Sequence, residues 1–182
     1  MFKLRYQIFE TDEELHKNIN HMKKDEFTIH GFISLVFNSN KVGFIMADEG
    51  IVNPNLKENK IYLYDDDLCW WLETLLRVSK VLDSQDYVRF QILESWDMWI
   101  SLEKHDKKLI ATSFRYYDAK AQDVISLEKI NSEDIRFCEE IGLEEFKSAV
   151  YNQTKNFLKE LKNINSDLLK LNEIIELIEF IL

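Results

Sequence analysis

Three consecutive segments of alternating apolar and polar residues constrain the fold of this chain more than any other feature of its sequence. They span residues 86–94, 97–103 and 108–117, and short polar links join them. Alternation with a period of two places the apolar side chains of a β-strand on one face, and links this short connect antiparallel neighbours. The sequence therefore predicts an antiparallel meander, with Ile110, Thr112, Phe114 and Tyr116 sharing one face of its last strand.

The residues before the meander predict both strands and helices. The expected elements are a strand at 2–9, a helix opening at the capping box Thr11-Asp12-Glu13-Glu14, a hairpin of 27–37 and 42–46 around Asn38-Ser39-Asn40, a loop at 48–59, a strand at 61–64 and a helix at 67–82. The helix at 67–82 carries its apolar residues within one broad arc. We therefore expect this helix to face the core.

The residues after the meander predict two further helices. Residues 123–129 and 134–139 are weaker strand candidates, Gly142 precedes an amphipathic helix, and a last helix is expected to start near Asn165 or Ser166. No strand–helix–strand alternation is present, so a parallel sheet is not expected. The sequence predicts an α+β fold in which an antiparallel sheet carries helices on one face and the chain ends in two helices.

Length and composition favour one folded domain covering residues 1–182. A chain of 182 residues can remove about 70% of its unfolded surface from water, and no segment rich in proline, glycine or serine divides it. Aspartate and glutamate number 33 against 23 lysines and arginines, which gives a formal net charge of −10. This excess argues against nucleic-acid binding, which usually needs a basic surface, and favours a basic partner.

Targeting signals and cysteine usage predict a cytoplasmic protein. The N-terminus lacks the apolar run of a signal peptide, and charged residues interrupt the apolar C-terminal stretch of 168–182, so no membrane association is expected. Cys69 and Cys138 lie far apart and form no CxxC pair. Both are predicted to be reduced and mostly buried thiols.

Motifs for catalysis and cofactor binding are missing from the sequence. Four glycines cannot build a GxGxxG or GxxxxGK[ST] phosphate loop, and no G-x-S-x-G motif is present. His16 and His21 are spaced by five residues, whereas two zinc ligands on one helix need a spacing of four. The sequence therefore predicts a protein that is not an enzyme and that holds no cofactor or metal. A hydrolase that uses dispersed carboxylates ranks last among the hypotheses.

An acidic run in the last third of the chain is the first candidate binding site. It comprises Asp123, Glu128, Glu133, Asp134, Glu139, Glu140, Glu144 and Glu145, against Lys129 and Arg136 as the bases within it. A surface of this charge speeds the encounter with a cationic partner and disfavours an anionic one. The alternative is that these acids form a solvated face that keeps the protein soluble.

Aromatic residues beside acids form the second candidate site. Trp70 projects from the polar side of its predicted helix, and Trp96 and Trp99 flank Asp97 at a turn of the meander. Partly exposed tryptophans anchor many interfaces because they bury a large area at low entropic cost. The alternative is that they pack beneath a loop or against the C-terminal helices.

The last helix has more apolar surface than one face can hold. Leu169, Leu177 and Phe180 lie away from the stripe that contains Leu168, Leu171 and Ile174. Such a helix is either packed between other elements or contributes to self-association. A structural or regulatory module that forms a homodimer through this helix is therefore the alternative hypothesis for function.

Several segments together resemble a known class of proteins. These segments are Tyr64-Asp65-Asp66-Asp67-Leu68-Cys69-Trp70-Trp71-Leu72, the meander after it, and the acidic run that ends in Gly142-Leu143-Glu144-Glu145-Phe146. As a pattern, the chain resembles the small acidic cytosolic immunity proteins of bacterial toxin–immunity systems, including contact-dependent inhibition and related polymorphic toxins. The resemblance implies a non-catalytic protein that binds a cognate, often basic, toxin domain and blocks its active site or substrate surface.

Overall fold

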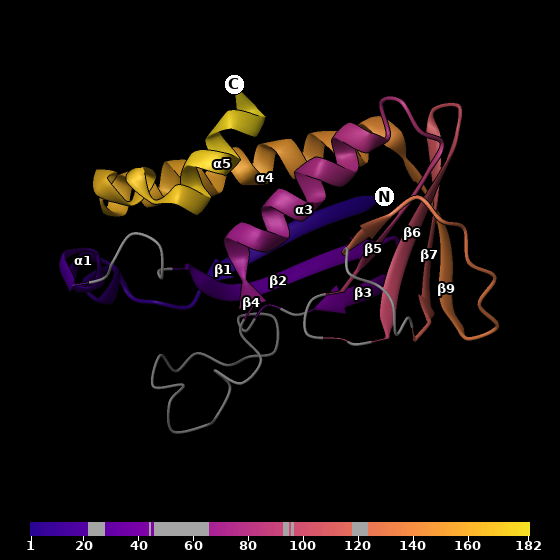
Figure 1. Cartoon of the computed structure of the whole chain (residues 1–182), viewed down its shortest axis with the longest axis horizontal. Coiled ribbons are helices and arrows are strands. Elements are labelled where there is room, and N and C mark those ends of the chain that lie inside the picture. Colours follow the sequence, from indigo (N-terminus) through magenta and orange to yellow (C-terminus); the bar gives the residue numbers. More distant parts are fainter. Residues whose placement is uncertain (22–27, 44, 46–65, 93–94, 96, 118–123) are drawn as a thin grey trace.

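The fold is α+β, as the sequence predicts, and contains two antiparallel sheets beside a layer of helices. The computed structural model describes residues 1–21, 28–43, 45, 66–92, 95, 97–117 and 124–182. Figure 1 shows a layer of helices above one sheet, with the second sheet standing at the end of this layer. The sequence predicts a single sheet, whereas the described strands divide into two. Alternation reveals the faces of a strand but not which strands pair.

The first sheet, here called the N-terminal sheet, contains β1 (Phe2–Ile8), β2 (His30–Phe37), β3 (Asn40–Gly43) and the short β4 (Asp66–Asp67). The order is β1-β2-β3, and β4 pairs with β2. The predicted hairpin is confirmed, with Asn38 in the left-handed conformation of its turn (φ 54°). The predicted loop at 48–59 and the predicted strand at 61–64 lie outside the described residues.

Helix α1 (Asp12–His21) follows β1 and begins at the predicted capping box. The backbone amide of Thr11 donates to Glu14 Oε2 at 3.0 Å, and the amide of Glu14 donates to Thr11 Oγ1 at 3.3 Å. These reciprocal bonds satisfy two amides that a helix start leaves without intrahelical partners.

The second sheet, here called the meander sheet, has the order β8-β5-β6-β7-β9. Its strands are β5 (Tyr87–Gln91), β6 (Met98–His105), β7 (Lys108–Arg115), β8 (Ile125–Ser126) and β9 (Ile135–Gly142), and all described pairs are antiparallel. The predicted meander of β5, β6 and β7 is confirmed. Ile110, Thr112 and Phe114 share one face of β7, as predicted, but this face lies opposite the core, because Leu109 and Ala111 point into the core.

Among the described residues, two helices pack against strands of the N-terminal sheet, and a third packs against these two helices. Helix α3 (Leu68–Val81) begins where Asp67 Oδ1 accepts a hydrogen bond from the amide of Trp70 at 3.0 Å. Helix α4 (Leu143–Ile164) follows β9 directly. A 3-10 turn (Ser166–Lys170) comes next, and the last α-helix, α5 (Asn172–Ile181), starts later than predicted because Leu171 is extended (φ −69°, ψ 142°).

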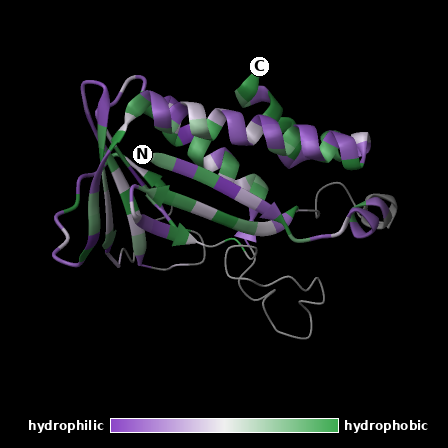
Figure 2. Cartoon of the chain, turned by 180° about the vertical axis from the view of Figure 1, so that it is seen from behind, coloured by the Kyte–Doolittle hydropathy of each residue, from purple (hydrophilic) through white to green (hydrophobic). Residues whose placement is uncertain are grey.

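One cluster of buried apolar residues joins both sheets to the helices. Trp71, Leu72 and Leu75 of α3 are buried, as its apolar arc predicts. A Cβ at Gly31 of β2 would lie 2.5 Å from Leu68 Cδ1, so glycine permits the close approach of α3 to this strand. Figure 2 shows hydrophilic residues over much of the outward surface of α4. None of the described helices combines the length and apolar character that crossing a bilayer requires.

Candidate functional site

A segment between β8 and β9 crosses the meander sheet on the face opposite the core. We call residues 127–134 the strap, and we call the face that it crosses, which carries Arg89 and Trp99, the outer face. The strap must cross the sheet because β8 pairs with β5 at one edge, whereas β9 pairs with β7 at the other. Lys129 Nζ lies 2.7 Å from Glu103 Oε1 of β6, and Ser132 Oγ donates to the Arg115 carbonyl of β7 at 2.6 Å.

Arg89 of β5 lies buried beneath the strap with 2% of its surface exposed. Its guanidinium carbon is 4.4 Å from the ring centroid of Trp99 and 5.6 Å from that of Tyr116. Its Nη2 is 3.7 Å from Glu128 Oε2 of the strap. Cation–π contacts gain strength when water is excluded, so Arg89 ties the strap to an aromatic floor.

Several of the predicted acidic residues already have partners inside the molecule. Glu139 accepts hydrogen bonds from Asn38 and Asn40, each at 2.6 Å, and so links β9 to the hairpin of the N-terminal sheet. Glu140 pairs with Lys108 at 2.5 Å. Glu144 and Glu145 lie in the first turn of α4, where the helix dipole favours negative charge. The acidic run is therefore not one uniform surface.

The strap holds three acids that remain open to a partner. Glu128 keeps 75% of its side chain exposed despite its contact with Arg89, and Glu133 and Asp134 are exposed. No ion pair joins Glu133 or Asp134 to a base among the described residues. Leu127 at the start of the strap and Ile135 just after it are 52% and 55% exposed. Asp123 lies outside the described residues.

The tryptophan candidates separate into different environments. Trp99 is only 1% exposed, so its assignment as an interface anchor is wrong; its Nε1 donates to the Tyr116 carbonyl at 3.1 Å and its ring stacks on Arg89. Trp70 is partly exposed and meets Trp71 edge-on at 6.2 Å. Asp97 Oδ2 lies 3.6 Å from Arg115 Nε, and Trp96 is outside the described residues.

The arginine at the centre of the outer face is the residue that sequence reasoning missed. Arg89 occupies a polar position between Val88 and Phe90, which a period-two pattern assigns to solvent. The aromatic residues that follow in the meander could have indicated this role, because Trp99 and Tyr116 supply rings on which a guanidinium stacks.

The two cysteines have different environments, and the prediction of two buried thiols holds for one of them. Cys69 in α3 is buried, whereas Cys138 is exposed because it lies on the outer face of the edge strand β9. Thr112 Oγ1 lies 3.6 Å from its sulfur. Cys138 is therefore the thiol that reagents in solution can reach.

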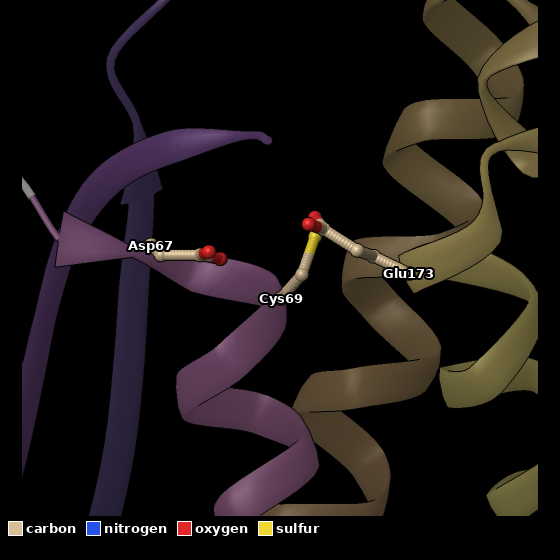
Figure 3. Close-up of side chains that lie close together, drawn as sticks. All are labelled: Asp67, Cys69 and Glu173. Atoms are coloured by element: carbon tan, nitrogen blue, oxygen red, sulfur yellow. The ribbon is translucent and has the colours of Figure 1, made fainter. Parts of the chain in front are cut away.

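Cys69 also belongs to a cluster with two carboxylates at the start of α3. The sulfur of Cys69 and carboxylate oxygens of Asp67 and Glu173 all lie within 4.8 Å of one another. Figure 3 shows the Glu173 carboxylate beside the Cys69 sulfur, with the Asp67 carboxylate pointing toward them from the end of β4. A thiolate and two carboxylates are donors that hold divalent cations in proteins.

Burial and neighbouring charges keep the Cys69 thiol protonated at ordinary pH. Burial raises the pKa of the Cys69 thiol well above its usual value, and the charges of Asp67 and Glu173 raise it further. The thiol is therefore a poor nucleophile. One oxygen of Asp67 also caps α3. The arrangement serves helix capping and packing, and a cation would have to displace the thiol proton in order to bind there.

Replacing Glu173 with glutamine is expected to stabilise the protein near neutral pH. Burial first, and then Asp67, raise the pKa of Glu173 above its ordinary 4.5. A raised pKa in the folded state means that stability is lost as pH rises through that pKa, because the charged form is disfavoured. Since Glu173 is partly exposed, the gain is at most about 1 kcal/mol, or about 2–4 °C in Tm.

Thermal unfolding of Glu173→Gln and wild type at about pH 7 and about pH 4 measures this effect. The gain should vanish at the lower pH, where the wild-type carboxyl is neutral. An equal gain at both pH values would contradict the electrostatic cause.

Helix α5 packs against α3 and α4, which accounts for most of its additional apolar surface. Leu177 is fully buried, and the ring of Phe180 lies beneath Arg77 and Lys80 of α3 at 5.9 and 5.8 Å. Ile175 remains 41% exposed. The residues that suggested self-association are thus largely used inside the protein, and homodimerisation stays a prediction.

Comparison of the chain with models of protein families, with curated proteins and with solved structures finds no match.

Proposed function

We propose that this chain is a non-catalytic binding protein of the immunity type, which acts in the cytoplasm and neutralises a basic toxin domain by direct binding through the strap. The observation that supports the proposal is the composition of this segment. Exposed acids, Glu128, Glu133 and Asp134, lie between the exposed apolar side chains of Leu127 and Ile135. Interfaces combine apolar contacts with a charged rim in this way.

The contacts beneath the strap favour a preformed binding surface. Arg89, Glu103 and Arg115 hold it at three strands of the meander sheet. A partner therefore does not have to order this segment on binding, which lowers the entropic cost of association. The negative charge draws a basic domain toward the strap and disfavours acidic partners and nucleic acids. The proposed role requires no cofactor or metal.

Reversing two charges on the strap is expected to slow partner binding. The test partner is the protein encoded immediately upstream of this chain, purified and titrated against wild type and against Glu133→Lys/Asp134→Lys. The association rate of the variant should fall about tenfold at low salt, because like charges then face one another. Salt should slow wild-type association and have less effect on the variant.

A charge-matched variant on another element provides the control. Glu176→Lys/Glu179→Lys changes the net charge equally, on exposed positions of α5. Its association rate should stay within about threefold of wild type, since screening limits long-range effects. The proposal is wrong if the upstream protein does not bind, or if the control variant weakens binding as much as the strap variant does.

A further inference from the structure

A groove with a cavity volume of about 500 Å³ runs between β1 and α4, away from the strap. One wall is formed by consecutive residues 5–8 of β1, and the other by a stripe of α4 that contains Gln153, Asn156, Glu160 and Ile164. Figures 1 and 2 both show α4 lying along this strand. A strand and a helix thus form an elongated cleft.

The strand that lines this groove is at the edge of its sheet. Among the described residues, β1 pairs with β2 alone. The amide of Asn38 donates to the Met1 carbonyl, and the amide of Phe9 donates to the His30 carbonyl. In an antiparallel ladder alternate residues face the partner, so the odd-numbered residues of β1 bond to β2.

The even-numbered residues of β1 therefore direct their backbone amides and carbonyls away from β2. These residues are Leu4, Tyr6 and Ile8, and the groove begins at this edge of the sheet. No hydrogen bond of their backbone groups is formed within the described part of the chain. The ligand that best fits a row of such donors and acceptors is another extended chain.

The side chains around the groove are mainly acidic and amide-bearing. Among the described residues, Glu10, Asp12 and Glu160 line it together with the base Arg5, and Lys159 lines an adjoining pocket that shares Asp12 and Glu160. The Tyr6 hydroxyl donates to Glu160 Oε2 at 2.7 Å, and the Tyr6 ring packs edge-on against Phe157 at 5.5 Å. Burial and Glu160 raise the pKa of Tyr6, so the hydroxyl keeps its proton and holds the carboxylate in place at the groove.

We propose that this groove binds an extended segment of another protein that carries lysine or arginine, with the segment pairing to β1 as an added strand. Strand addition takes its affinity from main-chain hydrogen bonds and its specificity from side chains beside the edge. The outward backbone groups of β1 supply the main-chain hydrogen bonds. The carboxylates of Asp12 and Glu160 supply the specificity by favouring basic side chains.

The inference goes beyond the proposed function, because the groove belongs to the N-terminal sheet and the strap belongs to the meander sheet. Its test uses synthetic peptides and needs no toxin domain. Failure of either proposal is therefore visible without reference to the other.

The probe is acetyl-(Lys-Val)₄-amide, titrated by calorimetry, with acetyl-(Glu-Val)₄-amide as the charge control. A third peptide carries N-methyl groups on alternate amides of the lysine sequence, which removes half of its backbone donors. The lysine peptide should bind at least about tenfold tighter than the other two, since each lost contact weakens binding several-fold. Backbone amides of Leu4, Tyr6 and Ile8 should gain protection from hydrogen exchange in the complex.

A conservative variant tests the carboxylates. Asp12→Asn/Glu160→Gln keeps a hydrogen-bond acceptor beside Tyr6 and should weaken the lysine peptide about fivefold. Glu176→Gln/Glu179→Gln on α5 makes the same change in charge and should leave affinity unchanged. Equal binding of the three peptides, or protection outside β1, would overturn the proposal. So would a dimer that protects the β1 amides without peptide, because a second copy would then be the occupant.

Discussion

Truncation of Trp99 to alanine is expected to cost about 3–5 kcal/mol of folding free energy, the usual price of removing a large buried aromatic side chain. The side chain is 1% exposed, stacks on Arg89 and donates a hydrogen bond to Tyr116. The folded state of a typical domain is stable by only about 5–15 kcal/mol. Urea and thermal unfolding followed by circular dichroism should therefore show Tm lower by about 6–20 °C.

Trp70→Ala is the matched control for this prediction, because Trp70 is partly exposed at the start of α3. It removes the same side chain and should cost clearly less than Trp99→Ala, since less apolar surface leaves the interior. If the two variants lose equal stability, the contrast in burial between these tryptophans is contradicted. If Trp99→Ala unfolds at the wild-type temperature, its assignment to the protein interior is wrong.

The strands of the meander sheet show how much of the fold follows from the sequence. Period-two alternation predicts the meander and correctly assigns Val88, Phe90 and Ile100 to the core. In β7 the same pattern groups Ile110, Thr112 and Phe114 correctly but does not show which face meets the core: Leu109 and Ala111 belong to the core, and Phe114 is buried beside Trp99 on the opposite face. A strand covered on both faces does not alternate, and the sequence does not reveal that the strap supplies the second cover.

The acidic residues show the same limit at the candidate site. The sequence identifies each acid, but Glu139 has its hydrogen-bond donors at Asn38 and Asn40, far away along the chain. Pairing between the meander sheet and the hairpin decides which acids remain open, and local sequence carries no information about it. Capping acids are different: Glu14 and Asp67 act within three residues of their own positions, so their roles are predictable.

Replacing Arg89 with alanine is expected to lower the free energy of unfolding by about 2–4 kcal/mol and to release the strap. About 2 kcal/mol comes from the desolvated cation–π contacts with Trp99 and Tyr116, and the rest from the packed stem of the side chain. Glu128→Gln should cost less than about 1 kcal/mol, because that carboxylate is 75% exposed. Arg89 therefore depends on the rings more than on its ion pair.

A double-mutant cycle with the milder variants Arg89→Met and Trp99→Phe separates this stacking from burial alone. If the guanidinium and the indole interact directly, the two losses should deviate from additivity by about 0.5–3 kcal/mol, the range found for residues in contact. Hydrogen exchange should also accelerate at the strap amides in Arg89→Met, while the amides of β1 and β2 keep their protection. Additive losses together with an unchanged strap would show that Arg89 only fills space. Because the strap is the proposed binding surface, loosening it should also slow partner association in Arg89→Met, although no exposed acid has changed.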